Sequence, residues 1–98
     1  MHENKTLEDY GKLMYRLGRL RGVYVRDQIS YEKHRSIKSF QAGAPSALKV
    51  LEDIVNLKED FTNYIQEKNK RAYLLLSKEL SEVDNKCNEM RDFYMQFL

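Results

Sequence analysis

Residues 73–97 read YLLLSKELSEVDNKCNEMRDFYMQF and carry the most regular apolar pattern of the chain. The large apolar residues of this stretch recur at alternating steps of three and four positions, the spacing of one helix face and of a coiled-coil seam. The residues of this seam are Tyr73, Leu76, Leu80, Val83, Cys87, Met90, Tyr94 and Phe97. A strand would instead alternate every second residue, so the stretch predicts a helix with one apolar stripe.

The segment before this seam is also helical in pattern. Apolar residues mark one stripe at Ala47, Val50, Ile54, Leu57, Phe61 and Tyr64, and their neighbours Leu48, Leu51, Val55 and Ile65 make it broad enough to touch two helices. Residues 66–71, QEKNKR, are polar but contain no Gly or Pro. Two architectures therefore stay open. A turn at 66–71 gives a three-helix bundle, and a continuous helix gives a two-helix hairpin whose second arm overhangs the first.

Residues 41–46, QAGAPS, hold the strongest break in the chain. Gly closes a helix just past its end, and Pro fits the first turn of the next, so we predict a tight turn here. The residues before it read as one helical arm from Thr6, continuous or kinked at the Gly22–Val25 segment. The sequence thus predicts one all-α domain over residues 1–98, a helical hairpin with a turn near 41–46 whose second arm is either continuous or broken near 66–71 into a three-helix bundle.

Composition points away from catalysis. The chain has 98 residues, of which 42% are hydrophobic and 33% charged, a balance that suits long amphipathic helices. His2 and His34 have no second His at helical spacing, and the carboxylate pairs lie on the polar side of the helical pattern, so we expect no metal, cofactor or active site. Cys87 stands alone at an apolar position, which predicts a core residue.

Hydropathy gives no sign of a membrane segment. No apolar run approaches the roughly 18 residues of a membrane span, and the first residues lack the apolar stretch of a signal peptide. We therefore expect synthesis in the cytosol.

Charge is unevenly distributed along the chain. Between Tyr10 and Phe40 there are eight cations and two anions, whereas the whole chain carries only +2. The cations expected to form a stripe on one helix face are Lys12, Arg16, Arg19, Arg26 and Lys33. Such a stripe can follow a phosphate backbone, which makes nucleic-acid binding one functional hypothesis. The other is pairing with an acidic helix, either of a partner or of residues 41–98, which hold eight cations and ten anions.

The leading hypothesis is a helical protein–protein interaction module that forms a homo- or hetero-oligomer. The residues expected to bind the partner are Leu17, Leu20, Tyr24, Tyr73, Leu76, Leu80, Val83, Met90, Tyr94 and Phe97. Gly18 and Gly22, four positions apart, either permit close approach of another helix or are merely tolerated. A small phage-type regulator that inhibits a larger protein fits the same features.

The overall plan of about a hundred residues, two helical arms and the short turn Phe40-Gln41-Ala42-Gly43 resembles the WxG-type helical hairpins of type VII secretion. It is most similar to the helical partner proteins of LXG toxins, in which an aromatic residue and a glycine mark the turn. The resemblance implies a hairpin that pairs lengthwise with the helical N-terminal region of a toxin. It further implies a role as targeting factor or chaperone, and export together with that partner.

Overall fold

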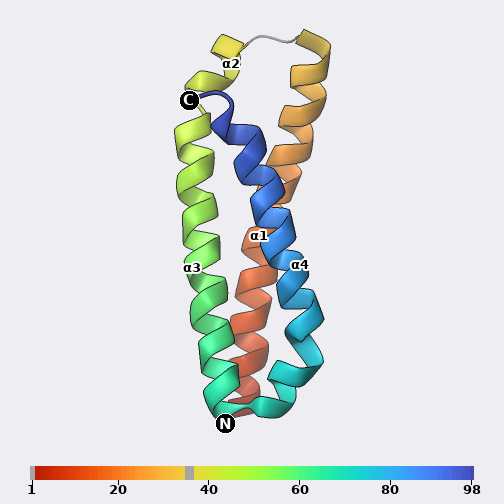
Figure 1. Cartoon of the computed structure of the whole chain (residues 1–98), viewed down its shortest axis with the longest axis vertical. Coiled ribbons are helices and arrows are strands. Elements are labelled where there is room, and N and C mark those ends of the chain that lie inside the picture. Colours follow the sequence, from red (N-terminus) through yellow and green to blue (C-terminus); the bar gives the residue numbers. More distant parts are fainter. Residues whose placement is uncertain (1, 35–36) are drawn as a thin grey trace.

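Three long helices and one short helix make up the part of the chain that a computed structural model describes, residues 2–34 and 37–98 (Figure 1). They are α1 (His2–His34), α2 (Ile37–Gln41), α3 (Ala44–Lys68) and α4 (Lys70–Met95). α3 runs antiparallel to α1 and α4, and the rod measures 49 × 19 × 17 Å (Figure 1). The described residues contain no strand, so the all-helical class is confirmed.

The second half of the chain turns at Asn69 and so forms a three-helix bundle in place of the two-helix hairpin. The Asn69 backbone N–H donates to the carbonyl of Ile65 at 2.9 Å and closes α3. Its side-chain oxygen accepts from the N–H of Ala72 at 3.2 Å and begins α4. Its side-chain NH₂ donates to the Thr6 hydroxyl at 3.2 Å, which ties the turn to α1.

The first arm also differs from the prediction of one helix up to Phe40. α1 runs without a break through Gly22–Val25 but ends at His34, and α2 is a separate helix that leads back toward α3 (Figure 1). The reason lies in the side chain of Phe40. Its ring packs in a cluster with Tyr31, Phe93 and Phe97, in which every pair of ring centroids is 5.0–6.5 Å apart. A straight arm would carry Phe40 away from these rings.

The core runs the length of the bundle and takes residues from all three long helices. Its buried apolar members are Leu13, Leu17, Leu20, Tyr24, Ala44, Leu51, Ile54, Phe61, Ile65, Leu80, Val83, Cys87, Met90, Tyr94 and Phe97. Pro45 stands in the first turn of α3, as predicted from the turn at 41–46. None of the described helices is both long enough and apolar enough to span a membrane.

Truncation of a core residue in α4 tests this packing. We expect Leu80→Ala to lower the free energy of unfolding by about 2–5 kcal/mol, because Leu80 is only 3% exposed and its loss leaves a cavity. The matched control is Leu74→Ala on the same helix, where the side chain is 75% exposed and the change should stay within about 0.5 kcal/mol. Urea unfolding followed by circular dichroism measures both. Equal effects of the two substitutions would contradict the buried seam.

Candidate functional site

The residues predicted to bind a partner, from α1 and from the α4 seam, lie inside the chain's own core. Leu17, Leu20, Tyr24, Leu80, Val83, Met90, Tyr94 and Phe97 are all buried, and Tyr73 and Leu76 are half-buried. These side chains pack against one another across the bundle. A partner reaches them only if the bundle opens, so their role in partner binding stays a prediction. Cys87 is a buried free thiol, as expected for a core residue, and burial raises its pKa.

The predicted basic stripe is present on α1. All five of its cations, Lys12, Arg16, Arg19, Arg26 and Lys33, are exposed. The structure divides them into two groups. Arg16, Arg19 and Arg26 line a groove between α1 and α3, whereas Lys12 and Lys33 lie outside it. Arg35, which also contributed to the positive charge of this arm, lies outside the described residues.

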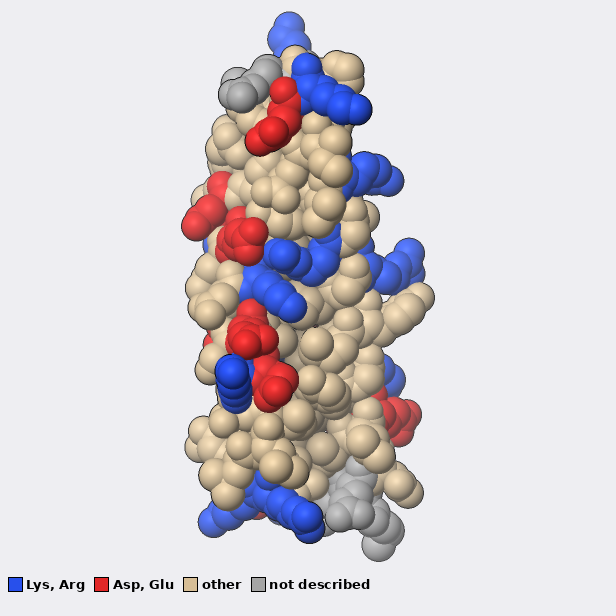
Figure 2. Space-filling view, turned by 90° about the vertical axis from the view of Figure 1, so that its right-hand side faces the viewer, with Lys and Arg blue, Asp and Glu red and all other residues tan. Residues whose placement is uncertain are grey.

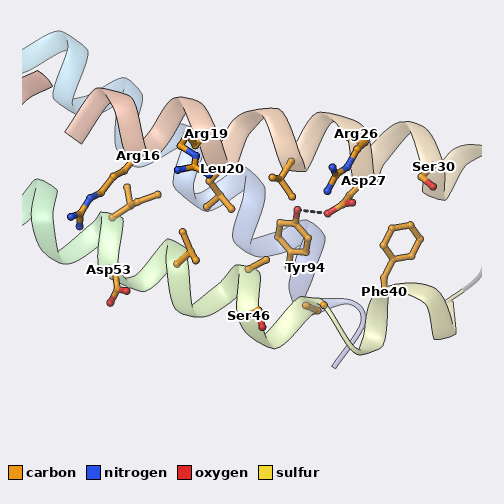
Figure 3. A pocket seen from close by; sticks show the side chains of 16 residues that line it. Arg16, Arg19, Leu20, Arg26, Asp27, Ser30, Phe40, Ser46, Asp53 and Tyr94 are labelled. Atoms are coloured by element: carbon orange, nitrogen blue, oxygen red, sulfur yellow. Dashed lines mark hydrogen bonds between the residues drawn. The ribbon is translucent and has the colours of Figure 1, made fainter. Parts of the chain in front are cut away.

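This groove has a volume of about 750 Å³. It extends along α1 from Arg16 to Ser30, roughly 21 Å at 1.5 Å per residue. The first half of α3, from Ala44 to Ile54, lines the opposite side of the groove. Phe40 of α2 lies at the end of the groove that points to the top of Figure 1. In Figure 3, α1 crosses above the groove and α3 below it, with the three arginines extending from α1.

The floor of the groove is apolar. Leu20 and Ile54 form its buried part, together with the ring of Tyr94, which reaches in from α4 behind the groove (Figure 3). Val23 and Val50 stand on opposite walls and are 36% and 45% exposed. The α3 wall is low at its start, because the lining residues there are small, and these are Gly43, Ala44, Ser46 and Ala47. The three floor residues are at most 5% exposed, so Val23 and Val50 supply the large apolar side chains that the described chain leaves uncovered in the groove.

A polar contact fixes the floor. The Tyr94 hydroxyl donates to the Asp27 carboxylate at 2.7 Å and so joins α4 to α1 beside Arg26 (Figure 3). Burial, and then this hydrogen bond, raise the pKa of Tyr94 above its ordinary value of 10.0. Tyr24 makes a similar contact between α1 and α4, because its hydroxyl donates to the Glu89 carboxylate at 3.1 Å. Burial and that bond raise the pKa of Tyr24 as well.

Ion pairs between helices occur elsewhere on the bundle. Arg21 of α1 pairs with Glu89 of α4 at 3.4 Å, which agrees with the expectation that the basic arm meets the acidic second half. Lys58 and Asp84 join α3 to α4 at 2.8 Å. On the face shown in Figure 2, cations and anions are interspersed and neither sign covers a continuous area. That face gives no broad positive surface for a phosphate backbone.

The glycines of α1 face outward. Gly11, Gly18 and Gly22 are exposed, and a Cβ placed on any of them would meet no atom within 4 Å. Within the described chain, no helix uses Gly18 and Gly22 for the close approach considered from their spacing. Val25 lies on the same outward side of α1, is 45% exposed and does not line the groove.

The described residues include no group of three or more His, Cys, Asp or Glu side chains placed to hold a metal ion. His34 is exposed, as a surface histidine should be. No family model, curated protein or solved structure matches the chain. The groove itself is therefore the observation on which a function has to rest.

The sequence predicts the cations of this groove but not the groove itself. Arg16, Arg19 and Arg26 belong to the predicted basic stripe, and Leu20 and Tyr94 belong to the predicted partner-binding set. The other lining residues belong to neither set, and they are Val23, Asp27, Ser30, Phe40, Gly43, Ala44, Ser46, Ala47, Val50, Asp53 and Ile54. The available signal was the cluster of small residues at 42–47, AGAPSA, which leaves one wall without bulky side chains.

Removal of the Tyr94 hydroxyl tests the contact that fixes the groove floor. We expect Tyr94→Phe to lower the free energy of unfolding by about 1–2 kcal/mol, because the bond to the Asp27 carboxylate is lost while the ring stays in place. Tyr15→Phe is the control, since Tyr15 is 65% exposed and no loss should follow.

The pH dependence gives a second readout of the same bond. The folded protein holds the Tyr94 proton more tightly than the unfolded chain, so stability is complete below pH 10 and falls as pH rises above it. Each such tyrosine contributes a slope of up to about 1.4 kcal/mol per pH unit. In Tyr94→Phe this alkaline slope should be smaller than in the parent. An unchanged slope in urea unfolding between pH 9 and pH 11 would contradict the assignment.

Proposed function

We propose that this chain is a non-catalytic protein–protein interaction module that receives an amphipathic helix of a partner in the α1–α3 groove. The observation that carries the proposal is the open trough of about 750 Å³ with an apolar floor. A trough between two helices accepts a third helix because the side chains of one fit between those of the others. Partners are recognised in this way by many helix-in-groove proteins.

The position of the groove supports this choice of occupant. α4 lies behind the floor, with α1 and α3 on either side (Figure 3). A helix laid in the groove would face α4 across the core and complete a four-helix bundle. The length of the groove, roughly 21 Å along α1, corresponds to about four helical turns. Val23 and Val50, the exposed valines of the two walls, would then be covered by the apolar face of the bound helix.

The finer form of the proposal rests on the resemblance to the partner proteins of LXG toxins. In this form, the bound helix belongs to the N-terminal region of a type VII-secreted toxin, and the chain is its chaperone or targeting factor. It would be made in the cytoplasm and leave with the toxin. The three-helix bundle departs from the hairpin plan of that family, so the proposed contact moves from the α4 seam to the groove.

Two other functions compete with this one. A small inhibitor of a larger protein would use the same groove and differ only in its partner. Nucleic-acid binding is favoured by one observation, the five exposed cations of α1. The groove itself favours a peptide, because its floor is apolar and a phosphate backbone has no apolar face to lay on it.

A substitution inside the groove tests the interaction role. The probe is a synthetic amphipathic helix of about 18 residues, roughly 27 Å long, with leucines on one face and glutamines on both flanks. We expect it to shift amide resonances of the groove residues in the full chain. Val50→Glu should weaken binding by roughly tenfold or more, because a carboxylate then faces the leucines.

Val25→Glu is the matched control. Val25 has the same exposure as Val50, 45%, but lies on the outward side of α1 and does not line the groove. It should leave the affinity unchanged, and both variants should keep the parent's stability within about 0.5 kcal/mol. If the glutamine peptide does not bind, or if Val25→Glu weakens it and Val50→Glu does not, the groove is not the binding site.

A further inference from the structure

The groove carries positive charge along one edge only. Arg16, Arg19 and Arg26 all extend from α1, whereas the α3 wall contributes Ser46, Val50 and Asp53 (Figure 3). Arg19 and Arg26 are seven positions apart, so they lie two turns apart on the same side of the helix, about 10.5 Å along its axis. An occupant of the groove would therefore meet cations on the flank that faces α1.

These three guanidinium groups have no ionic partner. Among the described residues, the ion pairs are formed by other cations, and Arg16, Arg19 and Arg26 take part in none. Two carboxylates of the lining offset part of this charge. Asp53 pairs with Lys49 at 3.9 Å, and Asp27 accepts a hydrogen bond from the neutral Tyr94 hydroxyl at 2.7 Å. Three arginines against two carboxylates leave the groove lining with a net charge of +1.

We propose that the partner helix is acidic on one flank. Its apolar face covers the groove floor, and its carboxylates, repeated at seven-residue spacing, meet Arg19 and Arg26 on the α1 side. This inference rests on the function proposed above and adds the chemistry of the partner. Arginine suits such a contact because its planar guanidinium donates two parallel hydrogen bonds to one carboxylate. Cations at the rim of an apolar groove also select the partner and guide its approach.

The distribution of cations separates this partner from a nucleic acid. Lys12, Arg19, Arg26 and Lys33 form one stripe at steps of seven, but only the two arginines line the groove. A phosphate backbone that followed the stripe would use all four residues. A helix seated on the apolar floor would use the inner pair alone. A nucleic acid should therefore depend on all four cations, whereas a helix in the groove should depend on Arg19 and Arg26 but not on Lys12 and Lys33.

The first part of the test compares three peptides that share one leucine face and differ on one flank, with glutamate, glutamine or lysine there. Binding to the full chain is measured by calorimetry at low and high salt. We expect the order glutamate, glutamine, lysine, with roughly a tenfold or larger difference in affinity between the first and the last. The advantage of the glutamate peptide should shrink as salt rises.

The second part uses paired charge reversals. Arg19→Glu with Arg26→Glu should reduce or reverse the preference for the glutamate peptide. Lys12→Glu with Lys33→Glu changes the net charge by the same amount outside the groove and should alter the preference less than roughly twofold. Both double variants change exposed side chains only, and their helix content is checked by circular dichroism.

The outcomes separate the two proposals. Equal binding of the three peptides, with sensitivity to Val50→Glu, leaves the interaction role standing and overturns the acidic partner. If no peptide binds, both proposals fail. If the two double variants lose affinity equally, and the chain binds a single-stranded oligonucleotide in a salt-dependent way, the stripe serves nucleic acid and the inference is overturned.

Discussion

The turn at Asn69 is the constraint on which the rest of the molecule depends. One side chain closes the turn by accepting from Ala72 and donating to Thr6, while its backbone N–H ends α3. Without this turn, α3 and α4 would form one rod and leave the apolar seam of residues 73–97 without a covering helix. With it, the seam folds back between α1 and α3 and becomes the core.

The same folding determines where apolar surface remains. α4 packs behind α1 and α3, and the ring of Tyr94 closes the bottom of the groove, which stays open on the side away from α4 (Figure 3). The aromatic cluster that includes Phe40 folds α2 over the upper end. Small residues at the start of α3 then leave a trough that no segment of the described chain covers. Because α1 forms one edge of this trough, its arginines Arg16, Arg19 and Arg26, which form no ion pair in the described chain, lie along that edge.

The sequence was sufficient for the parts of the fold that repeat. Strict three-and-four spacing predicted the α4 helix and its buried face, because burial of a helix face requires that period. It was insufficient at single positions. Asn69 is the one residue of 66–71 that prefers an N-cap to a helix interior, but this local preference alone does not end a helix, and its contact with Thr6 joins residues far apart in the chain. The end of α1 at His34 depends likewise on distant rings, and the groove depends on how three helices pack. Charge periodicity revealed the cations but not which of them border apolar surface.

In this proposal the partner helix binds a closed bundle, not one that has opened to expose its seam. Amide hydrogen exchange of the full chain, free and with the amphipathic helix bound, distinguishes the two modes. The amides of Leu80, Val83 and Met90 should be protected in both states. Protection should increase on binding at residues 20–26 of α1 and 47–54 of α3. Rapid exchange of the seam amides in the free chain, with protection gained there only on binding, would contradict binding to a closed bundle.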